Sequence, residues 1–159
     1  MLDLPTPPQS SKSVSCKRGP AAWALRLVLS GASLAWMALI FQASSSSPQE
    51  VNETLAGVAW LGPYRNIVGH LVLYAVLGSL LQICIWSWRS SLAWSARWAA
   101  AAIAIAVLYG ISDEYHQSLV PGRAATVLDV VVDSAGALAA VVAVSILAKL
   151  TRRRLNQSE

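Results

Sequence analysis

Charged residues are scarce in this chain: Asp, Glu, Lys and Arg make up 13% of its 159 residues, whereas hydrophobic residues make up 55%. Soluble domains carry about 25% charged residues, so this composition indicates a single integral membrane domain. The formal net charge of +4 does not indicate nucleic-acid binding. The basic residues lie in short segments beside apolar runs, where the positive-inside rule accounts for them. We therefore expect no nucleic-acid partner.

Cysteine is also rare, since the chain has only Cys16 in a polar segment and Cys84 in an apolar run. This distribution indicates no disulfide framework. The residues before Cys16 lack the apolar run of a lipoprotein signal, which favours ordinary membrane insertion. The sequence also contains no His-Glu-x-x-His motif and no internal repeat. It therefore predicts no cofactor, and its signal for a metal is weak.

Long apolar runs are what the sequence does contain. A hydrocarbon core of roughly 30 Å requires about 20 helical residues, and four runs meet that length. We predict an all-α fold, a polytopic membrane protein whose residues 21–148 form a small bundle of four transmembrane helices. Residues 1–20 are rich in Pro and Ser and predict a disordered basic tail, and residues 149–159 form a second basic tail. The expected spans are residues 21–42, 66–86, 97–118 and 126–148.

A shorter helix is predicted in the first outer loop. Ser47-Pro48-Gln49-Glu50 has the pattern of a capping box with Pro at the first helical position, which predicts a helix start at Pro48. Apolar residues then recur at helical spacing as far as Gly62-Pro63, which should end the helix. We predict a short amphipathic helix on the membrane surface, and an ordinary loop is the alternative. The apolar positions are Val51, Leu55, Val58 and Ala59.

The basic residues predict the orientation of the bundle. A cytoplasmic N-terminus leaves Arg65 and Arg123 as the basic residues outside, and both termini are then cytoplasmic. Arg26 lies near enough to the end of its span to extend toward the headgroups. The remaining basic residues are expected inside: Lys12, Lys17, Arg18, Arg89, Arg97, Lys149, Arg152, Arg153 and Arg154. Five tryptophans are expected at the inner interface: Trp23, Trp86, Trp88, Trp94 and Trp98.

Ionisable residues gather at one depth, near the outer ends of three spans. Ionisable groups at membrane depth are costly and are functional candidates by default. Within residues 113–117, the spacing of Asp113, His116 and Gln117 places them on one helical face, from which Glu114 points away. The spans also carry two further i, i+4 pairs: His70 with Tyr74, and Asp129 with Asp133.

These stripes predict that three helices face one cavity. Val120-Pro121-Gly122-Arg123 predicts a tight turn that makes the last two spans antiparallel neighbours. We expect residues 66–86, 97–118 and 126–148 to pack together, with residues 21–42 peripheral because that span has no polar stripe. His70 should lie near Asp113 or Asp129. Four glycines are expected at close-packing positions: Gly69, Gly78, Gly110 and Gly136.

Each polar residue alone also has a simpler structural interpretation. Asp129 would complement a helix dipole, Arg123 would pair with Asp113 or Glu114, and His70 would be a hydrogen-bonded buried histidine. Six polar groups on three helices exceed what neutralising one helix end requires. The cluster as a whole therefore indicates a site.

The motifs resemble those of the VanZ-like membrane proteins, named for a protein associated with resistance to the glycopeptide teicoplanin. The resemblance implies a bacterial cell-envelope protein of the cytoplasmic membrane, without an established reaction, and a link to teicoplanin susceptibility is an expectation that it raises. Four pieces carry the resemblance: Trp36–Phe41 leading into Ser44–Ser47, His70-x-x-x-Tyr74-x-x-Leu77-Gly78, Asp113-Glu114-x-His116-Gln117-x-x-x-Pro121-Gly122-Arg123, and Asp129-x-x-x-Asp133-x-x-Gly136.

Four functions stay open at this point. The first is a site in the outer leaflet that binds or modifies an envelope lipid or a lipid-linked cell-wall precursor, with Asp113 and His116 as general acid and base. The second is a metal-dependent membrane enzyme, and the third is a non-catalytic envelope scaffold. A proton-coupled transporter is the fourth. The first assigns substrate binding to His70, Tyr74, Glu114, Gln117, Arg123, Asp129 and Asp133; the second takes Zn or Mn ligands from His70, Asp113, His116 and Asp129 or Asp133.

Overall fold

A computed structural model describes residues 19–89 and 95–157, which form helices and contain no strand. The parts of the expected basic tails in residues 1–18 and 158–159, together with Lys12, Cys16, Lys17, Arg18 and Trp94, lie outside the described residues. The elements in chain order are α1 (Pro20–Ser45), α2 (Pro48–Thr54), the 3₁₀ segment η1 (Ala56–Tyr64), α3 (Arg65–Trp88), α4 (Ala96–Gln117) and α5 (Val127–Gln157).

Within the described residues, four helical segments are long and apolar enough to cross a membrane: α1, Ala56–Trp88, α4 and α5. The prediction of an all-α bundle of four transmembrane helices is confirmed. Large apolar side chains on the outer surfaces of the helices stay exposed, such as Leu27, Leu108 and Leu147, as expected for surfaces that contact lipid. α5 continues through Gln157, so the described basic residues after Ala148 extend this helix.

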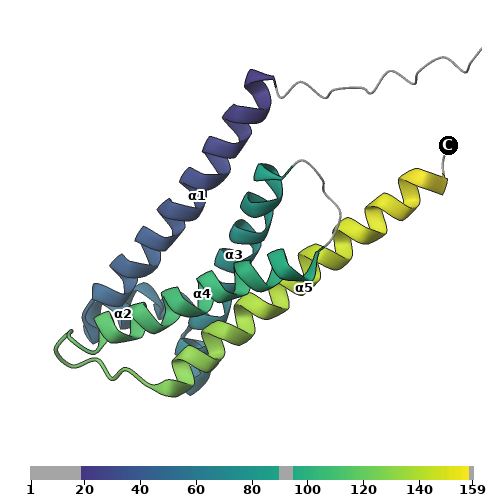
Figure 1. Ribbon diagram of the computed structural model, residues 1–159. Coiled ribbons are helices and arrows are strands. Elements are labelled where there is room, and N and C mark those ends of the chain that lie inside the picture. The colour runs from purple at the N-terminus through teal and green to yellow at the C-terminus, as the bar shows by residue number, and fades with distance from the viewer. Residues whose placement is uncertain (1–18, 90–94, 158–159) are drawn as a thin grey trace, which may run out of the picture.

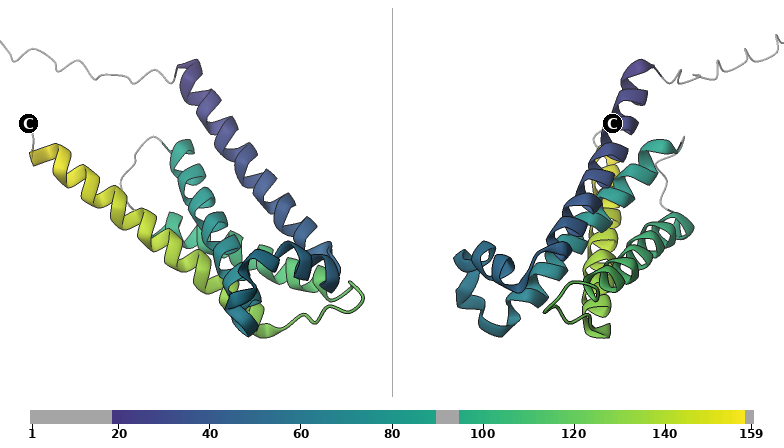
Figure 2. Two further views of the ribbon diagram at one scale, coloured as in Figure 1. Left: turned by 180° about the vertical axis from the view of Figure 1, so that it is seen from behind. Right: turned by 90° about the vertical axis from the view of Figure 1, so that its left-hand side faces the viewer.

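The bundle has two different ends (Figure 1, Figure 2). At one end, α1 and α4 finish, α3 and α5 begin, and α2 and η1 are located; we call this the α2 end. The start of α1 and the finishes of α3 and α5 lie toward the opposite end. The expected polar residues of α3, α4 and α5 all occur at the α2 end.

Two glycines allow α3 and α5 to pack closely. A Cβ at Gly136 would lie 2.5 Å from the backbone oxygen of Leu71, and a Cβ at Gly78 would lie 2.8 Å from that of Ala137. Any side chain there would force the backbones apart, so these close-packing predictions are confirmed. Gly69, in contrast, has nothing within 4 Å of its missing Cβ, so the prediction for that position is wrong.

α1 packs against α3 and α4 rather than lying at the periphery. The Trp36 indole donates to the Leu73 backbone oxygen at 2.9 Å, and the Tyr109 hydroxyl donates to that of Met37 at 2.5 Å. The expectation of a peripheral first span is wrong because α1 does carry polar residues that turn inward. Ser33 and Ser44 are both buried.

The predicted short helix is present as α2. The Ser47 hydroxyl accepts from the Glu50 backbone N–H, and the Glu50 carboxylate accepts from the Ser47 backbone N–H at 2.7 Å, which is the predicted capping box. α2 ends at Thr54, earlier than expected, and the chain continues as η1. Gly62 interrupts η1 with a φ of 55°, which explains the break before α3.

The predicted turn between α4 and α5 also forms. The Arg123 backbone N–H donates to the Val120 backbone oxygen at 3.1 Å, and Gly122 has a φ of 81°. Pro121 precedes this left-handed position, as in a type II turn, and fixes the geometry in which α4 leads back into α5.

Arg26 anchors the opposite end. Its guanidinium lies 5.0 Å from the Trp23 ring and 5.6 Å from the Trp88 ring, and its Nε donates to the Ser87 backbone oxygen at 2.9 Å. Arg26 is therefore buried against the last turn of α3. The two indoles pack edge to face at 5.7 Å, which places two of the expected interface tryptophans side by side.

Candidate functional site

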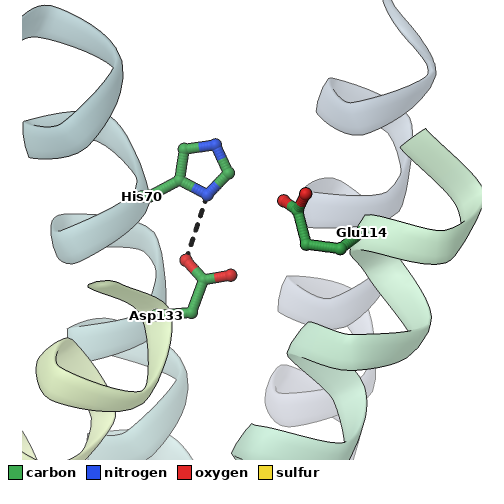
Figure 3. A group of neighbouring side chains, drawn as sticks. All are labelled: His70, Glu114 and Asp133. Carbon is green, nitrogen blue, oxygen red and sulfur yellow. Dashed lines mark hydrogen bonds and ion pairs between the residues drawn. The ribbon is translucent and has the colours of Figure 1, made fainter. Parts of the chain in front are cut away.

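Three ionisable side chains from three helices meet at the α2 end: His70 of α3, Glu114 of α4 and Asp133 of α5 (Figure 3). His70 Nδ1 lies 3.0 Å from Asp133 Oδ1, so the partner of His70 is Asp133 rather than the expected Asp113 or Asp129. Glu114 faces this pair across the space between the helices. One ligand atom from each of the three residues lies within 4.8 Å of the others.

Glu114 points away from Asp113, as the spacing predicted, but it is also buried and meets His70 and Asp133. Asp113 and Glu114 are neighbours in sequence and occupy different faces of α4, but both faces are covered. Asp113 Oδ2 accepts from the Ser44 hydroxyl of α1 at 2.7 Å, whereas Glu114 Oε2 accepts from the Thr126 backbone N–H at 3.1 Å. Because other parts of the chain contact α4 on two sides, helical spacing alone could not identify the buried face.

The side chain of His116, a residue of α4, packs against α1 rather than against a carboxylate. Its imidazole stacks on the Phe41 ring at a centroid distance of 4.1 Å, and Nε2 lies 2.9 Å from the Ser45 hydroxyl oxygen. Asp113 and His116 therefore bond to neighbouring serines of α1, and no hydrogen bond joins them among the contacts of the described chain. This arrangement does not provide the direct pairing of a general acid–base dyad.

Asp129 and Arg123 form hydrogen bonds with residues outside the cluster of His70, Glu114 and Asp133. The Thr126 hydroxyl accepts from the Asp129 backbone N–H at 3.2 Å and donates to Asp129 Oδ2 at 2.7 Å, so Asp129 belongs to the N-terminal cap of α5. Arg123 reaches α1, where Nη2 donates to the Ala43 backbone oxygen at 3.1 Å. The expected pairing of Arg123 with Asp113 or Glu114 is not among the ion pairs of residues 19–89 and 95–157.

A cavity of ≈ 200 Å³ opens between the C-terminal turns of α1, α2 and the first turns of α3. Its apolar wall includes Val51 of α2 and Leu55, which directly follows α2, and Asn66 of α3 also contributes. Five of the expected site residues line it: His70, Tyr74, Asp113, Gln117 and Arg123. The other four, Glu114, His116, Asp129 and Asp133, are not among its lining residues.

The profile of the VanZ/LLP1 family matches residues 30–148, which cover most of the chain and all of the cluster. The chain belongs to the VanZ/LLP1 family. No curated protein matches the chain, and no solved structure matches it either. This VanZ/LLP1 protein is thus a multi-pass membrane protein, and the chemistry of its site rests on its own geometry.

Several buried polar atoms at the site make no hydrogen bond within the described part of this VanZ/LLP1 protein. Asp133 is 0% exposed and Asp113 3%, so their unpaired oxygens have lost contact with bulk water. Leaving buried polar groups unpaired costs about 1–3 kcal/mol each, and more for charged groups. The atoms are Tyr74 Oη, Asp113 Oδ1, Glu114 Oε1, Arg123 Nε and Asp133 Oδ2.

Sequence reasoning missed the contribution of α1 and of the start of α5 to this VanZ/LLP1 site. Ser44 binds Asp113, and Thr126 holds both Glu114 and Asp129. Serines at the end of an apolar span look like an ordinary helix terminus, and the Ser44–Ser47 run gave no sign of which serine turns inward. The pattern Thr126-x-x-Asp129 was a readable signal, because it is typical of a helix N-terminus.

Proposed function

We propose that the cavity binds the phosphate-bearing headgroup of an envelope lipid or of a lipid-linked cell-wall precursor. The observation that carries the proposal is Arg123, a cation at the cavity wall. Its Nη2 donates to the Ala43 backbone oxygen, but its buried Nε makes no hydrogen bond to any other described residue. Guanidinium groups bind phosphate through charge-assisted hydrogen bonds, so this free donor suits an anionic headgroup.

The walls of the cavity support an amphiphilic ligand. Ile40, Leu55 and Leu73 offer an apolar surface, and Ser46 and Asn66 add hydrogen-bonding groups near the polar side. Ligand sites combine such apolar walls with a few placed polar groups that set orientation. α2 covers part of the cavity through Val51 and Thr54, so a lipid would enter beside this short helix.

The geometry favours binding over general acid–base catalysis. Asp113 lines the cavity with one oxygen held by Ser44, whereas His116 bonds to Ser45 and is not among the lining residues. A general base must reach the proton that it removes, and a pair must act on the same substrate. The assignment of Asp113 and His116 as a catalytic pair therefore receives no support from their positions.

Arg123→Ala tests the proposal in purified protein kept in a metal chelator. Loss of one charge-assisted hydrogen bond costs about 1.5–3 kcal/mol, so affinity for a short-chain phosphatidic acid should fall by about 10- to 100-fold. Arg65→Ala is the matched control, because Arg65 lies at the same end and also has a buried Nε without a partner in the described chain, but it does not line the cavity. Equal losses in both variants would contradict the proposal.

Two lipid probes distinguish the sources of the phosphate. A polyprenyl phosphate that binds more tightly than phosphatidic acid would identify a lipid-linked precursor, and the reverse order would identify a membrane phospholipid. Teicoplanin susceptibility of cells that express the parent or Arg123→Ala provides the physiological readout for the precursor. A phosphatidylcholine that binds as well as either probe would overturn the role of phosphate.

We further propose that the α2 end faces outward from the bacterial cytoplasmic membrane, with both termini in the cytoplasm. The support is the distribution of basic residues: Arg65 and Arg123 belong to the α2 end, whereas Arg89, Arg97 and Lys149 belong to the opposite part of the chain. Reporter fusions after Glu159 test this topology. An exported reporter would place the cavity on the cytoplasmic side.

A further inference from the structure

His70, Glu114 and Asp133 converge as a possible set of metal ligands (Figure 3). Of the three, His70 alone is among the lining residues of the cavity. Each residue comes from a different helix, and each offers a ligand atom within 4.8 Å of the other two. The closest pair, His70 Nδ1 and Asp133 Oδ1, is separated by 3.0 Å. Metal–ligand bonds of about 2.0–2.2 Å place neighbouring ligands of a tetrahedral ion about 3.3–3.6 Å apart, so a slight separation of this pair and a small inward movement of Glu114 would complete a three-ligand site.

Two unused oxygens independently point to a ligand at this position. Glu114 is 5% exposed and Asp133 is 0% exposed, yet Glu114 Oε1 and Asp133 Oδ2 have no hydrogen-bond partner among residues 19–89 and 95–157. When both are ionised, the two buried carboxylates carry two negative charges. Desolvation makes such charges expensive unless a cation is near, and a divalent cation would neutralise both while imidazole acts as a neutral ligand.

Neighbouring groups hold the carboxylates in place. The Thr126 backbone N–H fixes Glu114 through Oε2 and leaves Oε1 available. Gly110, one turn before Glu114 on α4, makes room for Asp133, because a Cβ there would lie 3.5 Å from Asp133 Oδ2 and 3.3 Å from the Tyr74 ring. Partners that orient the ligands are a regular feature of protein metal sites.

We propose that His70, Glu114 and Asp133 bind one divalent transition-metal ion, Zn²⁺ or Mn²⁺. One imidazole nitrogen with two carboxylate oxygens suits both ions, and three protein ligands leave a coordination position for a further group. His70 also lines the cavity, so the ion is held beside the proposed lipid site. The ligand set differs from the sequence-based alternative: Glu114 takes part, whereas His116 contacts α1 and Asp129 caps α5.

Metal titration of the full-length purified protein tests this inference. The protein, stripped with a chelator and exchanged into lipid-free detergent buffer, is titrated calorimetrically with ZnCl₂ and with MnCl₂. The parent should bind one equivalent of at least one ion. Loss of an orienting partner alone weakens metal sites about 10- to 100-fold, so Glu114→Gln and Asp133→Asn should each weaken binding by at least about 100-fold.

Two controls are matched in chemistry and position. Asp129→Asn removes a carboxylate from the first turn of α5, and His116→Gln removes the other histidine from the same end. Both variants should bind the metal as the parent does. No saturable binding by the parent, or equal weakening by these controls, would overturn the inference.

X-ray absorption of the Zn²⁺-loaded parent gives a second readout that does not depend on the folding of a variant. The spectrum should show nitrogen and oxygen ligands with one imidazole. Two imidazoles would require His116, and a sulfur ligand would require a cysteine, so either result would contradict the proposed set. Phosphate-lipid binding at Arg123 is measured in chelator, and metal binding is measured without lipid. Absence of metal binding would therefore leave the lipid result unchanged, and absence of lipid binding would leave the metal result unchanged.

Discussion

The two ends of the bundle bury charge in different ways. At the opposite end, Arg26 is 5% exposed, lies over two tryptophan rings and donates to a backbone oxygen, and none of its nitrogens is a buried atom without a partner in the described chain. At the α2 end, Glu114 and Asp133 are buried to the same degree, but each keeps one oxygen unpaired. The contacts of Arg26 stabilise the packing of α1 against α3. The unpaired oxygens of Glu114 and Asp133 remain available to bind a ligand.

Burial without a partner does not define a site by itself. The Gln82 amide is also buried and unpaired, with a side chain 1% exposed, and it is a neutral group on a single helix. The cluster at the α2 end differs because charged groups from three helices converge there within reach of one another. The site therefore differs from ordinary helix packing in two respects: ionisable groups converge, and some of their buried oxygens have no hydrogen-bond partner in the described chain.

Arg26→Met should produce the largest loss of stability. The variant keeps an apolar chain of similar length but loses the hydrogen bond to Ser87 and the contacts with two indoles. Cation–π contacts of this kind contribute about 0.5–2 kcal/mol, and a hydrogen bond from a charged group about 1.5–3 kcal/mol, so we expect a loss of roughly 2–4 kcal/mol. Thermal or denaturant unfolding in detergent measures it.

Arg97→Met is the control for that loss. Arg97 is exposed and contacts one indole, that of Trp98 at 5.5 Å, so its replacement should change stability by less than about 1 kcal/mol. Similar losses for Arg26→Met and Arg97→Met would show that the burial of Arg26 contributes nothing, and the comparison between the two ends would fail.

Gly136→Ala should disturb the α2 end through packing. The new Cβ would collide with the Leu71 backbone oxygen, and a backbone atom cannot turn aside as a side chain can. Overpacking costs about 1–3 kcal/mol, and separation of α3 from α5 would also move His70 away from Asp133. Unfolding should occur at a lower temperature and Zn²⁺ affinity should fall, whereas Gly31→Ala, which has open space, should lower neither. Parent-like behaviour of Gly136→Ala would contradict the close α3–α5 contact.

The sequence predicted those parts of the structure that local patterns determine. The apolar runs predicted the spans, Ser47-Pro48-Gln49-Glu50 predicted α2, and Pro121-Gly122 predicted the turn before α5. Residue spacing could not show how α4 sits between its neighbours, so it could not show that Glu114, on a different face from Asp113, would meet His70 and Asp133. The contact of Ser44 with Asp113 joins residues far apart in the chain, which no local pattern encodes.

Ser47→Ala should have a smaller and local effect. The substitution removes the hydroxyl of the capping box, and loss of such a cap costs about 1 kcal/mol of helix stability. Hydrogen exchange of residues 48–54 should become faster, while the unfolding temperature of the bundle stays close to that of the parent. Unchanged exchange would show that α2 is held by its contacts at the cavity rather than by its cap.

The same capping box predicts a pH dependence of α2. The backbone N–H and hydroxyl of Ser47 hold the pKa of Glu50 below its usual value of 4.5. The bond to the ionised carboxylate is therefore fully present above pH 4.5 and is lost as the pH falls through the lowered pKa. The protection of residues 48–54 from exchange, relative to the intrinsic rate at each pH, should fall only in that acidic range, and Glu50→Gln should remove the pH dependence. A loss of protection that begins near neutral pH would point to another group.

Unfolding of Glu114→Gln, measured with chelator and again with saturating Zn²⁺, tests the central claim most directly. The claim is that the unpaired carboxylates serve a ligand at the expense of stability, and the glutamine keeps an oxygen for the Thr126 N–H while removing the buried charge. The account predicts that, in chelator, the variant unfolds at the temperature of the parent or above it, and that the rise produced by Zn²⁺ in the parent disappears. A fall in chelator as large as that of Arg26→Met, with the rise on Zn²⁺ retained, would contradict it and would make Glu114 a structural residue.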